Sequence, residues 1–94
     1  MVFRGTRINN KTQAAKFLDI SENEILDFGK HDNGDWLYKD RDNYWHLFRF
    51  ENNKYIELTK NVNALYLTLY NNGDWSYVDD DGYEYLFRQK TTNM

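Results

Sequence analysis

The strongest constraint on the fold is an internal repeat, because residues 72–89 read nearly the same as residues 33–50. At an offset of 39 residues, 11 of the 18 aligned positions carry the same amino acid. A repeat of this length predicts two copies of one supersecondary unit within a shared domain. The identical positions are Asn33/Asn72, Gly34/Gly73, Asp35/Asp74, Trp36/Trp75, Tyr38/Tyr77, Asp40/Asp79, Asp42/Asp81, Tyr44/Tyr83, Leu47/Leu86, Phe48/Phe87 and Arg49/Arg88.

Triplets of polar residues recur along the chain from residue 32 onward, and each triplet ends in Gly or Asn. A three-residue hairpin loop is a type I turn followed by a left-handed residue, a conformation that Gly adopts freely and Asn at modest cost. We therefore expect five hairpin loops of one kind. They are residues 32–34, 41–43, 51–53, 71–73 and 80–82.

These loops fix a register, because a slip of one residue would move every side chain to the other face of the sheet. The register predicts one inward face that holds most of the large apolar side chains, and we interpret the repeated Trp and Tyr as core. The inward set is Phe28, Trp36, Tyr38, Phe48, Phe50, Ile56, Leu58, Leu65, Leu67, Leu69, Trp75, Tyr77, Tyr85 and Phe87. Within it, Phe48 is expected opposite Ile56, across the loop 51–53.

The N-terminal third has helical rather than alternating spacing, with apolar residues at Ala14, Ala15, Phe17 and Leu18. Asn10 or Thr12 can cap a first helix, and Ser21 with Glu24 forms a capping box for a second one. Residues 12–28 resemble the helix-turn-helix of excisionase-like and MerR-like regulators. The resemblance implies DNA binding, but the second helix would present acidic side chains where a recognition helix reads bases.

The fold class that follows is α+β, mainly β. It is an antiparallel meander of six to seven strands, either a curled sheet or a small barrel, with one or two short N-terminal helices. The 94 residues fit a single domain. Its parts are a basic arm (1–10), a helical cap (11–28) and two homologous hairpin units (29–90).

Amino-acid composition and charge predict the compartment of the protein and limit the partners that we expect for it. The chain has no Cys and no apolar run long enough to span a membrane, so we expect a cytoplasmic protein without membrane contact. The net charge is −3, although the N-terminal arm contributes Arg4, Arg7 and Lys11 and lacks acids. An acidic body argues against nucleic-acid binding except through this arm.

Catalytic chemistry has little support in the sequence. The two histidines, His31 and His46, lack a Ser or Cys partner placed as a nucleophile. The repeated Asp residues fall at loop starts, where carboxylates accept hydrogen bonds from turn backbone, and their spacing does not match a calcium loop. We expect no enzyme activity, no cofactor and no metal.

The opposite, outward face is aromatic and carries Arg, a composition that is enriched at protein-binding hot spots. The sequence leaves open whether the N-terminal helix covers part of this face. The candidate partner-binding residues are Trp45, Arg49, Tyr55, Tyr66, Tyr70 and Arg88.

The function that we expect is a non-enzymatic protein-binding module. A small phage or mobile-element accessory protein that inhibits host machinery, in the manner of anti-CRISPR proteins, fits the size and acidity, with a host nucleic-acid-processing complex as partner. Association of two copies of the chain through the same outward face, to form a homodimer, is a further expectation. Alternatives are single-stranded nucleic-acid binding or DNA-binding regulation, and carbohydrate binding, because residues 73–87 are similar to the hairpins of choline-binding and glucan-binding repeats.

Overall fold

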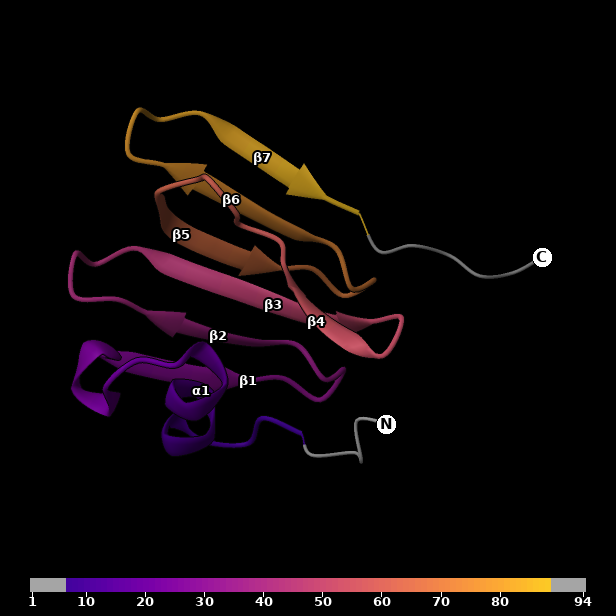
Figure 1. The fold of residues 1–94 in the computed structure, drawn as a ribbon. Coiled ribbons are helices and arrows are strands. Elements are labelled where there is room, and N and C mark those ends of the chain that lie inside the picture. The colour runs from indigo at the N-terminus through magenta and orange to yellow at the C-terminus, as the bar shows by residue number, and fades with distance from the viewer. Residues whose placement is uncertain (1–6, 89–94) are drawn as a thin grey trace.

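The computed structural model describes residues 7–88, which form an antiparallel sheet of seven strands with one α-helix against it (Figure 1). The sheet is not closed, since β1 and β7 lie at its two ends. The predicted fold class is therefore confirmed, as a curled sheet rather than a barrel. The elements are α1 (Lys11–Leu18), a 3-10 helix (Glu22–Glu24), β1 (Asp27–Lys30), β2 (Trp36–Lys39), β3 (Trp45–Glu51), β4 (Lys54–Glu57), β5 (Ala64–Leu69), β6 (Trp75–Asp79) and β7 (Glu84–Phe87).

Four of the five predicted loops have the expected geometry. Each closes with two backbone hydrogen bonds, as in the loop 71–73, where Tyr70 N–H donates to Asp74 O (2.9 Å) and Gly73 N–H donates to Tyr70 O (3.0 Å). The last residue of each loop is left-handed. The φ values are 97° at Gly34, 71° at Asn43, 94° at Gly73 and 89° at Gly82.

The prediction for residues 51–53 is wrong. Asn52 and Asn53 both have positive φ, 54° and 67°, which makes a two-residue turn between the paired residues Glu51 and Lys54. Such a turn matches the twist of a hairpin, and Asn tolerates its left-handed backbone. The register of β4 therefore moves by one residue, so that Phe48 lies opposite Glu57 and not opposite Ile56.

The large apolar side chains occupy two cores, so the prediction of one inward face is also wrong. We call β1–β4 the first unit and β5–β7 the second unit. In the first core, Trp36 and Phe48 of the first unit pack under Ala14 and Ala15 of α1. The predicted register of the aromatic pairs is nevertheless confirmed within each unit, since Trp36 lies opposite Phe48 and Trp75 opposite Phe87.

The second core lies between the two units. There, Leu37 and Leu47 on the other side of the first unit pack with Trp75 of the second unit. The sheet passes from one unit to the next through the pair Trp45–Ala64, and the register of β5 shifts between Ala64 and Tyr66. Irregularities of this kind bend a strand. As a result, the aromatic side of the second unit covers the back of the first unit.

The N-terminal part has one α-helix and one short turn. Asn10 caps α1, because its side chain accepts a hydrogen bond from Gln13 N–H (2.8 Å), and Asp19 ends the helix in the left-handed conformation. The predicted capping box at Ser21 does not form, and residues 22–24 make a three-residue 3-10 helix. DNA reading by this segment stays a prediction from the resemblance alone. Neither helix within residues 7–88 has the length and apolar character to cross a bilayer.

Candidate partner-binding face

The second unit has a side that faces away from the first unit, and we call it the outer face. It consists of the side chains that alternate with the second core, namely Tyr66, Thr68, Tyr70, Ser76, Val78, Glu84, Leu86 and Arg88. Tyr66 is 67% exposed, Tyr70 45% and Leu86 51%. Three large apolar side chains therefore remain accessible on one face.

The repeat supplies an internal comparison for this face. Leu47 is the counterpart of Leu86, and Arg49 is the counterpart of Arg88. In the first unit these positions are covered by the second unit, since Leu47 is fully buried and Arg49 is 6% exposed. Leu86 and Arg88 instead are exposed. On this side of the repeat, the positions of Leu47 and Arg49 are thus buried in the first unit and exposed in the second, whereas Ser76 is buried like its counterpart Leu37.

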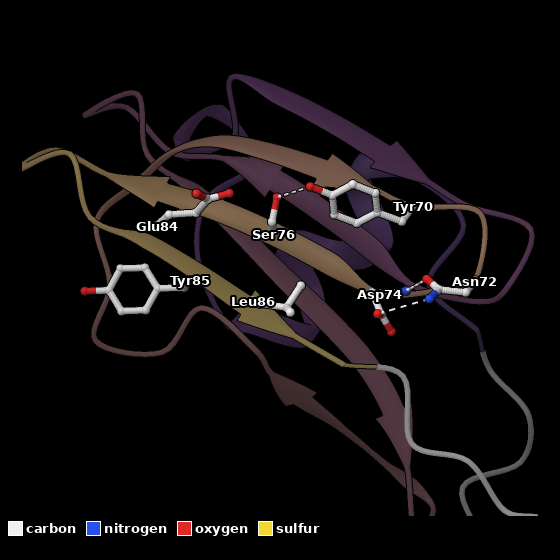
Figure 2. A pocket seen from close by; sticks show the side chains of 7 residues that line it. All are labelled: Tyr70, Asn72, Asp74, Ser76, Glu84, Tyr85 and Leu86. Atoms are coloured by element: carbon white, nitrogen blue, oxygen red, sulfur yellow. Dashed lines mark hydrogen bonds between the residues drawn. The ribbon is translucent and has the colours of Figure 1, made fainter.

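A shallow hollow crosses part of the outer face (Figure 2). The Tyr70 and Ser76 hydroxyls lie 3.3 Å apart on one rim, and Asn72 binds Asp74 beside them. Leu86 lies beside Ser76 on the neighbouring strand β7, and Glu84 supplies a negative charge. The hollow therefore offers apolar surface together with hydrogen-bonding groups, as protein interfaces do. Its lining is Tyr70, Asn72, Asp74, Ser76, Glu84, Tyr85 and Leu86.

The structure separates the six predicted site residues into two groups. Tyr66, Tyr70 and Arg88 lie exposed on or at the end of the outer face. The other three belong to the scaffold, so their predicted place on a shared exposed face is wrong. Arg49 is buried between the units, half-buried Trp45 packs against the second core, and half-buried Tyr55 packs against the first core because the turn at Asn52–Asn53 reverses its side.

Arg49 is held by a buried ion pair that the sequence reasoning missed. Its Nε and Nη2 donate to the two carboxylate oxygens of Asp35 at 2.9 and 2.6 Å, and Nη2 also donates to Gly73 O at 3.0 Å. Trp75 Nε1 donates to the same carboxylate at 2.7 Å. Asp35 is 2% exposed. The Asp35 carboxylate therefore links both units through charge-assisted hydrogen bonds.

His46 forms a second polar cluster at the edge of the first core. Its Nδ1 lies 2.8 Å from Glu57 Oε2 and its Nε2 lies 2.7 Å from Asp40 Oδ2, while its ring stacks on Tyr38. Thr59 donates to the same oxygen of Glu57. Both ring nitrogens are occupied by carboxylates, so the cluster ties the loop at Asp40 to β4.

The repeat preserves the same contact in the second unit with a different side chain. Tyr85 stands where His46 stands in the first unit, and its hydroxyl donates to Asp79 Oδ2 at 2.9 Å. Tyr85 stacks on Tyr77 as His46 stacks on Tyr38. Asp79 also accepts backbone hydrogen bonds in its loop, as predicted. The contact is therefore part of the scaffold of the repeat.

The pKa values of the His46 cluster predict a pH-dependent stability. Burial lowers the pKa of His46, but hydrogen bonds to Glu57 and Asp40 outweigh it and raise that pKa above 6.5. Stability from this shift is full below pH 6.5 and is lost as the pH rises through the folded pKa. Burial raises the pKa of both carboxyls, yet their bonds to His46 lower it overall, so their contribution disappears at acid pH.

We therefore expect the free energy of unfolding to fall as the pH rises from 6 to 9, and His46→Gln to flatten this slope. Urea denaturation across that pH range measures both proteins. His31→Gln is the control, because the ring of His31 packs on Trp75 in the other core. Equal slopes for the parent and His46→Gln would contradict the role of the cluster.

Two other features concern the binding of a metal ion and of nucleic acid, namely an acidic cluster and the predicted basic arm. The carboxylates of Asp79, Asp80 and Asp81 lie within 4.8 Å of one another, but those of Asp79 and Asp80 already accept hydrogen bonds from the protein. In the predicted basic arm, the Arg7 guanidinium lies 5.1 Å from the Phe50 ring centre, and Lys11 begins α1. Arg4 lies outside the described residues.

Comparisons of the chain with protein-family models, with curated proteins and with solved structures gave no match.

Proposed function

We propose that the protein is a non-enzymatic protein-binding module and that it binds its partner through the outer face of the second unit. The observation that carries this proposal is the contrast between the two copies of the repeat. Leu47 and Arg49 lie in a buried interface in the first unit, whereas their counterparts Leu86 and Arg88 are exposed in the second, where Tyr66 and Tyr70 are also accessible.

The residues that differ between the copies indicate that the outer face makes a reversible contact with a partner and is not one half of a permanent hydrophobic core. Leu37 and Trp45 of the first unit correspond to Ser76 and Glu84 in the second. Ser76 is buried, but Glu84 is exposed, and an exposed polar replacement keeps the end of a stacked array soluble. Exposed tyrosines among polar groups are the composition of interfaces that form and dissociate.

The other classes of function receive less support from the geometry. Arg49 is one of the two arginines among the candidate site residues, and its guanidinium is engaged with Asp35 instead of being free for a phosphate. The exposed part of the outer face also carries Glu84. Catalysis has no support at His46, because both of its ring nitrogens face carboxylates.

The cellular role within this proposal is that of a small phage or mobile-element accessory protein. Its partner would be a host protein, for example a component of a nucleic-acid-processing complex. The grounds are the length of 94 residues and the acidic body. An acidic protein is attracted to basic surfaces, which enzymes acting on nucleic acids carry.

Replacement of outer-face tyrosines tests the proposal. We expect Tyr66→Ala and Tyr70→Ala each to weaken capture of the partner by about 2 kcal/mol, roughly 30-fold in Kd, and to leave the melting temperature nearly unchanged. The measurement is retention of a host protein from lysate on immobilised parent and variants, followed by titration of the retained protein.

The matched control is Tyr83→Ala. Tyr83 is 68% exposed, as Tyr66 is, but it alternates with Glu84 and therefore belongs to the other side of the second unit. The proposal fails if Tyr83→Ala weakens capture as much as Tyr66→Ala, or if both outer-face variants bind like the parent. If the immobilised protein retains nucleic acid, and this retention falls steeply as the salt concentration rises, the alternative of nucleic-acid binding is supported.

A further inference from the structure

β7 is an edge strand of the sheet. It pairs with β6, and within residues 7–88 no strand pairs with its other side. Figure 1 shows it at the opposite end of the molecule from β1. Edge strands expose rows of unpaired N–H and C=O groups, which are templates for pairing with another chain.

The pairing with β6 determines which backbone groups of β7 point outward. Asp79 N–H donates to Tyr83 O at the start of the hairpin (2.9 Å). Hydrogen-bonded pairs alternate along an antiparallel ladder, so Tyr85 and Phe87 also direct their backbone groups toward β6. Glu84 and Leu86 therefore direct theirs away from the sheet, and Arg88, the first residue after β7, continues this pattern if the strand is extended by pairing.

The side chains around Leu86 are self-complementary. The sequence Glu84-Tyr85-Leu86-Phe87-Arg88 has an acid at one end, a base at the other and aromatics between them. An antiparallel copy centred on Leu86 places Glu84 opposite Arg88, Tyr85 opposite Phe87 and Leu86 opposite itself. Opposite charges and aromatic pairs across strands are stabilising, whereas like charges directly opposite are destabilising.

We propose that β7 pairs with β7 of a second copy of this chain, antiparallel and about a two-fold axis at Leu86. The outward backbone groups of Glu84, Leu86 and Arg88 then form the hydrogen bonds, and each two-fold dimer gains two Glu84–Arg88 ion pairs. The contact is isologous, as in most dimers of identical chains. This inference does not depend on the proposed function, because the strand pairing uses the outward backbone groups of β7, whatever the outer face binds.

The dimer has a consequence for the outer face. Strands that pair about an axis perpendicular to the sheet keep equivalent side chains on the same side. The two outer faces therefore join into one surface with two sets of Tyr66, Tyr70 and Leu86. A partner with two equivalent sites would bind this surface with increased avidity.

A charge-reversal cycle tests the register. We expect the parent to dimerise reversibly in sedimentation equilibrium from about 1 µM to 1 mM, a range that covers weak self-association. Glu84→Arg and Arg88→Glu each place like charges opposite one another twice per dimer, and each should weaken the dimer at least about tenfold. The double variant Glu84→Arg/Arg88→Glu restores both pairs, so its Kd should return to within about threefold of the parent.

A control and a second readout complete the experiment. Lys30→Glu changes a charge on β1, the opposite edge of the sheet, and should leave the dimer unchanged. Hydrogen exchange of the Leu86 amide should slow as the protein concentration rises. The proposal is overturned if the parent stays monomeric throughout, if the double variant remains as weak as the single ones, or if Leu86 exchange is independent of concentration.

Discussion

Trp36→Ala and Trp75→Ala are each expected to lower the free energy of unfolding by about 3–5 kcal/mol, the usual cost of removing a large aromatic from a core. Trp36 is fully buried in the first core, where its ring stacks on Phe48 with centroids 4.3 Å apart. Trp75 is 2% exposed in the second core and also donates to Asp35. Because the total free energy of unfolding of a small domain is about 5–15 kcal/mol, either variant loses much of its stability.

Urea denaturation of the two variants and the parent measures this effect. Tyr66→Ala is the control, since Tyr66 is exposed on the outer face and its loss should cost within about 0.5 kcal/mol. Values within about 1 kcal/mol of the parent for both tryptophan variants would mean that these side chains are not core residues. A stacking surface would then be the better interpretation of the repeat.

Arg49→Ala is expected to destabilise the protein by a similar amount, about 3–5 kcal/mol, because it leaves the Asp35 carboxylate buried without its cation. The guanidinium donates to both oxygens of Asp35 and to Gly73 O, so its loss breaks contacts within and between the two units. The measurement is again urea denaturation at neutral pH. A loss below about 1 kcal/mol would show that water or another group satisfies Asp35.

Most of the hairpin geometry could be predicted from the sequence, because turn chemistry and side-chain alternation are local. Gly34, Asn43, Gly73 and Gly82 all adopt the left-handed backbone that the three-residue loop requires. A loop of fixed length determines which residues lie opposite one another, and the aromatic pairs of each unit followed directly.

The turn after β3 shows where this reasoning failed. Residues 51–53 end in Asn, like the other triplets, but Asn52-Asn53 supplies two consecutive residues that tolerate positive φ. That pair fits the two-residue hairpin turn, which is the commonest. The predicted loop includes Glu51, which belongs to β3, and this error places Tyr55 on the wrong side.

The division into two cores could not be obtained from the loops, because it depends on a bend between Ala64 and Tyr66. One signal was nevertheless present in the sequence. Leu37, Trp45 and Leu47 make the second side of the first unit apolar, and strands that are apolar on both sides are usually buried on both. Ser76 and Glu84, the counterparts of Leu37 and Trp45, are polar, which indicates that the second unit lies at the end of the stack.

Only the part of the candidate site that depends on the alternation of side chains along a strand could be predicted from the sequence. Tyr66 and Tyr70 were assigned to the accessible side correctly, since the alternation within β5 was correct. The ion pair was missed although the register implied it, because Trp36 opposite Phe48 places Asp35 opposite Arg49. Two opposite charges directly across a strand pair predict a salt bridge, and the second core buries it.

The central claim is that Leu47 and Arg49 are buried between the units, whereas their counterparts Leu86 and Arg88 are open for binding. The most direct measurement is the difference in unfolding free energy between Arg49→Ala and Arg88→Ala, two changes at equivalent positions of the repeat. The structure predicts a cost of about 3–5 kcal/mol for Arg49→Ala and less than about 0.5 kcal/mol for Arg88→Ala. Equal costs at the two positions would contradict the claim, because the outer face would then be as buried as its counterpart in the first unit.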